Sequence, residues 1–123
     1  MALKVRKSAV REQAEMCPIG ACMGLIGGAW TPNIIWHLSE GARRFSELRE
    51  DAKPISAKML SMRLKEMEAA GIVTRTVVDT SPPSVEYALT PLGRELIPAI
   101  EAIARVGFKL KREQAKKRLS VAR

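Results

Sequence analysis

Residues 55–71, ISAKMLSMRLKEMEAAG, have the side chains and spacing best suited to an interaction. At 100° per residue, three apolar residues share one side of a helix and three long side chains share the opposite side: Leu60, Leu64 and Met67 against Lys58, Met62 and Lys65. We expect the apolar side to be buried. The opposite side is then free to enter the major groove of DNA, whose width admits an α-helix.

A solvated polar face is the alternative explanation of charges at this spacing. Met62 argues against it, because a partner surface such as thymine methyl groups explains a large apolar side chain in a charged face better than water does. Small or hydrogen-bonding residues occupy the first turn, where a helix also attracts phosphate, and nearby basic residues can neutralise flanking phosphates. The predicted DNA contacts are Ser56, Ala57, Lys58, Ser61, Met62, Lys65, Arg43, Arg44, Arg49, Lys53 and Arg75.

The elements that would position these residues can be read from caps, prolines and the change of period. In order, the sequence predicts a helix from Pro18, a helix over residues 31–40, an extended piece at 42–45, a short helix capped by Ser46, the helix capped by Ser56, a β-hairpin over 72–89 with Pro82-Pro83 at its tip, and a last helix capped by Thr90 and kinked at Pro98. A lone hairpin must pack on helices. We therefore predict a mainly α protein with a small β-hairpin, arranged as a winged helix-turn-helix.

Length and charge favour a small binding module over an enzyme. The chain has 123 residues and a formal charge of +8. Residues 105–123 carry most of this charge, +7, either as a solvated helix end or as a contact surface, and residues 43–65 carry +4. We expect three regions: an N-terminal arm or short helix (1–16), the winged helix-turn-helix with its dimerisation helices (17–107), and a basic helical C-terminal extension (108–123).

Residues 17–38 contain no formally charged side chain, but glycines, two prolines and polar residues interrupt the stretch, so we expect no membrane span. The N-terminus does not resemble a secretory signal, which favours a cytoplasmic protein. His37, the only histidine, has no cysteine or carboxylate at metal-ligand spacing. No nucleophile-base pair, phosphate-binding glycine loop or paired carboxylates stand out, and we predict neither an enzyme nor a cofactor.

Four stretches carry a family resemblance: CPIGACMGLIGGAW, RRFSELRE, ISAKMLSMRLKEMEAAGIVTRT and PPSVEYALTPLGREL. Together they resemble the HxlR-type winged helix-turn-helix transcriptional regulators of bacteria, over about residues 17–107. The resemblance implies a homodimer that binds palindromic operators in double-stranded DNA and pairs through its N-terminal and last helices. Met67 replaces a more usual Leu, and Ala29 replaces a frequent Lys, which removes any phosphate contact at that position.

Dimerisation also follows from physical arguments, because a monomer of this size reads too few base pairs and two-fold pairing supplies a second half-site. Glycines every fourth residue of the first helix permit close backbone approach, and the apolar stripe of the last helix needs a larger partner. The predicted interface residues are Gly20, Gly24, Leu96, Ile100, Ile103 and Leu110.

Cys17 precedes Pro18 at a predicted helix N-terminus, where the helix dipole favours the reactive thiolate. We hypothesise that Cys17 senses oxidants or electrophiles, as cysteines at this place do in some members of the resembled family. The competing interpretation is a small buried hydrophobe. Two further alternatives stay open for the whole chain: a MarR-like regulator that binds a small aromatic effector, with a pocket formed by Trp30, Trp36 and Met23, and a winged helix that binds proteins rather than DNA.

Overall fold

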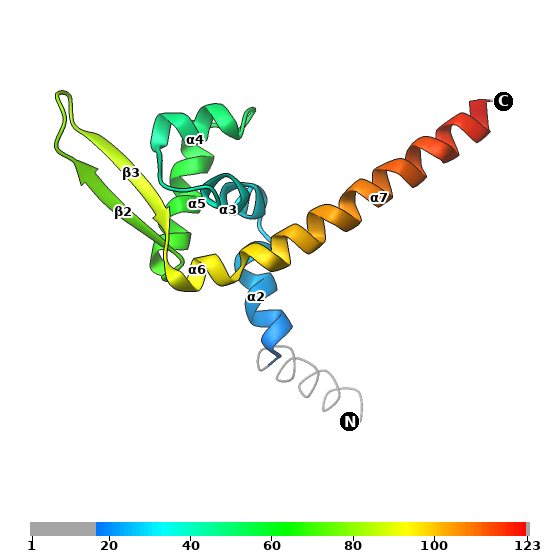
Figure 1. Ribbon diagram of the computed structural model, residues 1–123, viewed down its shortest axis with the longest axis horizontal. Helices are drawn as coiled ribbons and strands as arrows, with labels where there is room; N and C mark the ends of the chain where they lie inside the picture. Colours follow the sequence, from blue (N-terminus) through cyan, green and yellow to red (C-terminus); the bar gives the residue numbers. More distant parts are fainter. Residues whose placement is uncertain (1–16, 123) are drawn as a thin grey trace, which may run out of the picture.

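The computed structural model describes residues 17–122, and the predicted N-terminal arm (1–16) lies outside the described residues, as does Arg123. Figure 1 shows helices packed beside a small sheet, with the hairpin projecting at one end and the last helix at the other. The elements are α2 (Pro18–Ile26), α3 (Thr31–Leu38), β1 (Arg43–Arg44), α4 (Phe45–Asp51), α5 (Ala57–Ala69), β2 (Val73–Val78), β3 (Ser84–Leu89), α6 (Pro91–Glu95) and α7 (Ile97–Ala122). The predicted mainly α winged helix-turn-helix is confirmed.

The two helices before the sheet begin where their prolines predict. Pro18 and Pro32 lie in the first turns of α2 and α3, where a missing N–H costs no hydrogen bond. Helix α3 ends at Leu38, two residues earlier than expected, and Gly41 follows with a φ of 143°. This φ is poorly accessible to other residues, so Gly41 is what allows the chain to turn towards β1.

The start of α4 corrects one prediction. The helix begins at Phe45 with Arg44 at the N-cap, so Ser46 lies inside the first turn and does not cap it. The carboxylate of Glu47 accepts a hydrogen bond of 2.9 Å from the backbone N–H of Arg44. A glutamate three residues inside the helix thus supplies the capping interaction that we expected from a serine.

Helix α5 begins as predicted. The Ser56 hydroxyl oxygen accepts a hydrogen bond of 3.1 Å from the N–H of Met59, which satisfies one of the free donors of the first turn. Ile55 and Leu60 are both buried in the core, as expected for a hydrophobic staple. Gly71, with a φ of 77°, ends the helix and turns the chain into β2.

The sheet has one strand more than the predicted hairpin. The extended piece expected near residues 42–45 forms β1, which pairs antiparallel with β3, so the strand order is β1-β3-β2. Arg43 and Arg75 both pair with Tyr87, from opposite sides. Strand β1 therefore connects the sheet directly to the start of α4.

The last helix differs from its prediction, because the expected single helix kinked at Pro98 is broken into α6 and α7 around Leu96. Pro98 has no N–H to donate to the carbonyl of Arg94, so the first helix cannot continue through it. Thr90 caps α6 as expected: its hydroxyl accepts from the N–H of Gly93 at 3.0 Å and donates to the Gly71 carbonyl at 2.7 Å. Helix α7 runs on past residue 107, so the predicted extension continues the same helix.

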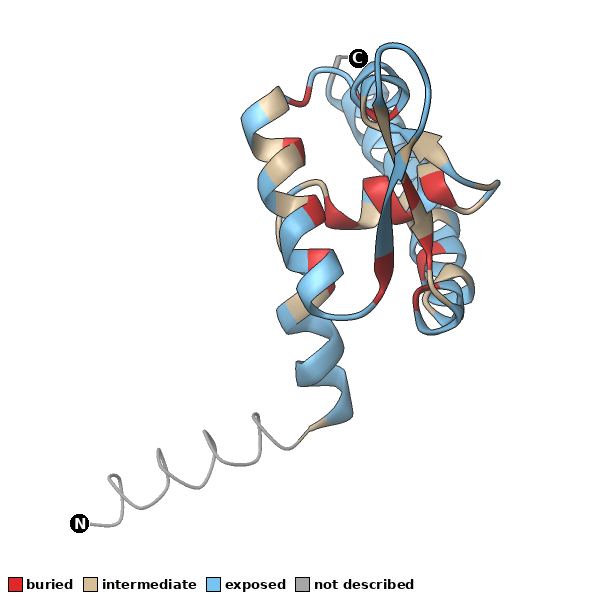
Figure 2. Ribbon diagram, turned by 90° about the vertical axis from the view of Figure 1, so that its left-hand side faces the viewer, coloured by how far each residue is buried: buried red, intermediate tan, exposed pale blue. Residues whose placement is uncertain are grey.

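The core lies where the helices meet the sheet, and Figure 2 shows buried residues on these inward-facing sides. Its largest fully buried side chains come from α3, α4, α5 and the residue before β2: Thr31, Ile34, Ile35, Leu38, Leu48, Leu60, Leu64, Met67 and Ile72. Trp30 is only partly buried and packs against the core. Among residues 17–122, no helix combines the length and the apolar character that crossing a bilayer requires.

Candidate nucleic-acid interface

Helix α5 presents two opposite faces, as the sequence predicts. Leu60, Leu64 and Met67 are at most 1% exposed. On the other side Lys58 and Lys65 are exposed and Met62 is 41% exposed. Burial of the leucine side fixes the rotation of the helix, and the lysine side is thereby presented to solvent at a constant angle.

The first turn of α5 contributes less than its residue types suggest. The Ser56 hydroxyl oxygen is engaged in the cap, and only its O–H remains to donate to a partner. Ala57 and Ser61 are half-buried. The remaining N–H groups of this turn point out of the helix start and form a site where phosphate binds readily.

A shallow groove beside α5 gathers basic side chains from three elements. Arg44 comes from β1, Lys65 from α5 and Arg75 from β2. The groove has a volume of about 490 Å³ and is lined by Arg44, Phe45, Ser46, Ser61, Lys65, Arg75, Ser84, Val85 and Tyr87. Three cations and three serine hydroxyls on one open surface can bind the phosphates of a strand that passes between α5 and the hairpin.

Two further predicted contacts, Arg49 and Lys53, lie on a separate surface at the end of α4. They line a neighbouring groove together with Phe45, Ser46, Glu50, Pro54 and Ile55. Lys53 is partly neutralised, because its Nζ lies 2.6 Å from a carboxylate oxygen of Glu50. Both ions of this pair are about two-thirds exposed, so the interaction is weak and the lysine can exchange it for a phosphate.

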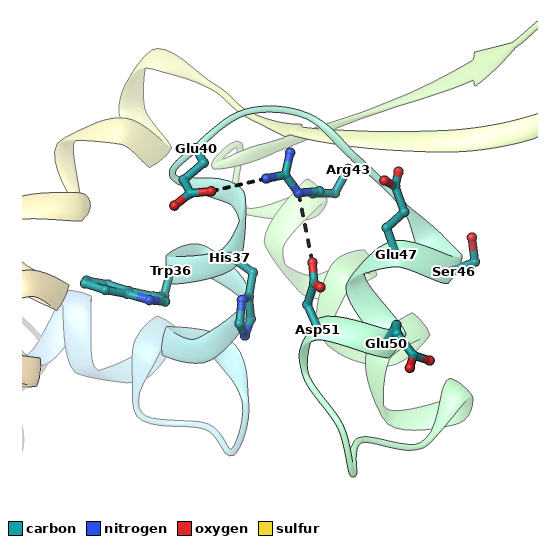
Figure 3. A pocket seen from close by; sticks show the side chains of 8 residues that line it. All are labelled: Trp36, His37, Glu40, Arg43, Ser46, Glu47, Glu50 and Asp51. Carbon is teal, nitrogen blue, oxygen red and sulfur yellow. Dashed lines mark hydrogen bonds and ion pairs between the residues drawn. The ribbon is translucent and has the colours of Figure 1, made fainter.

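Arg43 does not join the other basic residues. Its guanidinium lies 3.4 Å from a carboxylate oxygen of Glu40 and 3.9 Å from one of Asp51 (Figure 3), and Arg43 does not line the groove that Arg44 lines. Arg43 is thus paired with carboxylates and lies outside the groove, and its role as a phosphate ligand stays a prediction.

The pocket around Arg43 also bears on the aromatic-effector alternative. Trp36 and His37 line it beside the carboxylates of Glu40, Glu47, Glu50 and Asp51 (Figure 3). Trp30 and Met23, expected in an aromatic effector pocket with Trp36, do not line it. The surroundings of Trp36 are therefore polar and mostly acidic, which does not suit an apolar aromatic ligand.

Arg63 is a positioning residue that was not among the predicted site residues. Its Nε donates to the carbonyl of Ala29 at 2.9 Å and its Nη1 pairs with Glu66 at 3.0 Å, with only 19% of the side chain exposed. Ala29 lies in the loop between α2 and α3, where Trp30 adopts a left-handed φ of 75°. Arg63 therefore fastens the middle of α5 to this loop. The sequence signal for this role was Arg63-Leu64, which forms part of the stretch ISAKMLSMRLKEMEAAGIVTRT that resembles the family motif.

The hairpin contributes little positive charge. Arg75 is the only basic residue of β2 and β3, and the tip carries Asp79 between the strands. Thr80 donates from its hydroxyl to the Pro82 carbonyl at 2.9 Å, which holds the tip in shape. Contacts made by this tip would therefore depend on shape and neutral groups rather than on cations.

The predicted dimer residues are distributed unevenly between surface and core. Ile103 and Leu110 on α7 are 52% and 57% exposed, and Gly20 and Gly24 on α2 are exposed. Leu96 is half-buried and Ile100 is buried in the core of its own protomer, so Ile100 offers little surface to a second copy. Other exposed apolar side chains on these two helices include Ile19 and Met23 on α2 and Val106 on α7.

Both cysteines are free thiols, and they occupy different surroundings. Cys17 is half-buried at the N-cap of α2. Cys22 is exposed and lines an apolar groove of about 390 Å³ with Ala21, Leu25, Ala70, Ile72, Leu92, Glu95 and Leu96. Within residues 17–122, no group of three or more His, Cys, Asp or Glu side chains is placed to hold a metal ion.

Residues 25–115 match the model of the HxlR-like helix-turn-helix family. The HTH-type transcriptional regulator YybR of Bacillus subtilis (strain 168) is 39% identical over 94 residues, which are 76% of this chain and 75% of the relative. The oxidised form of the redox regulator HypR superposes with a TM-score of 0.71 at 39% identity, covering 76% of this chain and 96% of that chain. The reduced form of YodB from B. subtilis gives 0.65 at 38%, covering 72% and 88%. The chain therefore belongs to the HxlR-like helix-turn-helix family of transcriptional regulators.

Proposed function

We propose that the protein is a homodimeric transcriptional regulator that binds a palindromic operator through α5 and the groove beside it. The observation that carries this proposal is the convergence of Arg44, Lys65 and Arg75, from three elements, on the open surface next to the exposed face of α5. In this arrangement Lys58, Met62 and Lys65 reach base edges and the adjoining sugar-phosphate backbone, while the groove binds phosphates.

The DNA-binding proposal is tested with Lys58→Ala and Lys65→Ala, because both side chains are exposed and neither contributes to the core. We expect both variants to bind operator DNA more weakly and to melt at the wild-type temperature. Unchanged operator affinity in both variants would show that the other face of α5, or another element, binds the DNA.

The proposed homodimer rests on the exposed apolar side chains of α2 and α7. Monomeric proteins rarely expose contiguous apolar patches of this kind, and two-fold pairing would cover them with the same surface of a second copy. Leu110→Glu would place a charge in the proposed interface, and we expect sedimentation to show monomers at concentrations where the wild type is dimeric. A wild type that is monomeric throughout would refute this part.

We propose a redox response at Cys17 as the regulatory input. The half-buried position of Cys17 at the start of α2 supports it, since oxidation there would alter the helix that begins the proposed dimer surface. Structural relatives include oxidised and reduced HypR and diamide-treated YodB. The effector is thus an oxidant or electrophile, and the site of action is the cytoplasm.

Operator binding by Cys17→Ser, with and without diamide, tests the sensor. We expect oxidant to change the affinity of the wild type and of Cys22→Ser, and to leave Cys17→Ser unchanged. An equal response of wild type and Cys17→Ser would exclude Cys17. If Cys22→Ser alone lost the response, the thiol beside the apolar groove would be the sensor instead.

A further inference from the structure

The outer part of α7 extends away from the rest of the protein. Figure 1 shows its C-terminal half clear of every other labelled element. All residues from 108 to 121 are exposed. The helix therefore continues for several turns without packing against the protomer that it belongs to, and its side chains are available to a partner.

Four basic residues form one ridge along this helix. Arg105, Lys109, Arg112 and Lys116 are spaced by four, three and four residues, which places them within about 60° of the helix circumference. All four are exposed. Ile103, from the proposed dimer surface, lies on the other side of the helix. A dimer formed through that surface would leave the basic ridge uncovered.

The ridge is poorly neutralised within the protomer. Within residues 17–122, Lys116 alone among the four forms an ion pair, with Glu113 at 3.6 Å, and both partners are largely exposed. Like charges three or four residues apart destabilise a helix. A partner that supplied a row of negative charges would remove this repulsion and gain the attraction of the whole row.

We infer that the basic ridge of α7 binds the phosphate backbone of duplex DNA outside the base pairs that α5 reads. This inference rests on the proposed function. From Arg105 to Lys116 the ridge spans roughly 16 Å at 1.5 Å per residue, and a duplex presents about ten phosphate charges over that length. In Figure 1, the hairpin tip and the end of α7 both rise towards the top of the view, at opposite ends of the protein.

Two full-length variants with equal loss of charge separate the ridge from net charge alone. Glutamine replaces lysine or arginine in both, because it preserves helix propensity. The ridge variant carries Lys109→Gln, Arg112→Gln and Lys116→Gln. The matched control carries Lys111→Gln, Lys117→Gln and Arg118→Gln, which lie on other faces of the same helix.

Binding of each protein to a duplex of random sequence, about 40 base pairs long, is measured across salt concentrations. Three lost phosphate contacts per protomer are six per proposed dimer, which should lower the slope of log K against log salt by about 5.4. Between about 50 and 200 mM salt, the affinity of the ridge variant should therefore fall by a factor roughly 1,800 times smaller than that of wild type. We expect the matched control to retain most of the wild-type slope. Circular dichroism verifies that both variants remain helical.

Equal slopes for wild type and ridge variant would overturn the inference while leaving operator binding by α5 intact. Equal reductions in the ridge variant and the matched control would also overturn it, because net charge would then suffice. If the ridge variant lost binding to random duplex while Lys65→Gln had no effect on any duplex, DNA binding by the ridge would be supported and the proposed role of α5 would be refuted. A wild type that binds no duplex at low salt would refute both.

Discussion

Replacing Lys65 by glutamine tests the proposed groove at a single position. Lys65 is exposed, lines the groove with Arg44 and Arg75, and takes part in no ion pair within residues 17–122. In the proposed complex, its loss removes one phosphate contact per protomer and two per dimer. With about 0.9 counterions released per contact, the slope of log K against log salt should fall by about 1.8.

When salt is raised from about 50 to about 200 mM, this lower slope means that the affinity of Lys65→Gln falls by a factor about 12 times smaller than the factor for wild type. Fluorescence anisotropy with an operator duplex measures the slopes, and a thermal melt verifies folding, which a surface substitution should change by no more than about 0.5 kcal/mol. Arg94→Gln, an exposed charge on α6, is the matched control. A wild-type slope in folded Lys65→Gln would refute the assignment of the groove to phosphate binding.

Three further predictions concern stability and the positioning of α5. Leu64→Ala should lower the free energy of unfolding by about 2–5 kcal/mol, since Leu64 is 1% exposed, and a loss below about 1 kcal/mol in urea denaturation would contradict its place in the core. Gly93→Ala should lower the free energy of unfolding by about 1–3 kcal/mol, because a Cβ there meets the Ile72 carbonyl oxygen. Gly107→Ala is the control and should not lower stability, since open space surrounds that position. Equal melting temperatures of the two variants would refute the close packing of α6. Arg63→Met should lower the free energy of unfolding by about 1–3 kcal/mol, because the hydrogen bond to the α2–α3 loop is lost, and it should weaken operator binding. An unchanged melting temperature would mean that Arg63 does not hold α5 against this loop.

The faces of α5 could be predicted from sequence because periodicity reports burial directly. Leu60, Leu64 and Met67 recur at the helical period, and the core accepts all three. The cap at Ser56 was predictable for a similar reason, since a serine followed by an amphipathic run is a local signal. Local chemistry also placed α2, α3 and the hairpin correctly.

The positions that depend on contacts distant in sequence could not be predicted. Arg43 and Arg44 look alike in the sequence, but Arg43 pairs with the carboxylates of Glu40 and Asp51, whereas Arg44 lines the groove. Arg63 bonds to a carbonyl 34 residues earlier. Periodicity within one helix carries no information about such partners.

The cap of α4 and the break before α7 were missed for a different reason. Ser46 and Glu47 both carry capping groups, and the choice between them depends on where β1 ends. Pro98 correctly signals an interruption, but the free carbonyls lie one turn earlier, so the break falls around Leu96. The sequence therefore indicated that α4 is capped and that the last helix is interrupted, but not at which residues.

Selection of bound fragments from a pool of random duplexes, with the purified protein, is the decisive test of sequence-specific DNA binding by a two-fold dimer. A two-fold dimer that reads DNA through two α5 helices should enrich an inverted repeat whose half-sites lie one helical turn, or a multiple of it, apart. Enrichment of no sequence, together with the absence of duplex binding at low ionic strength, would contradict the account.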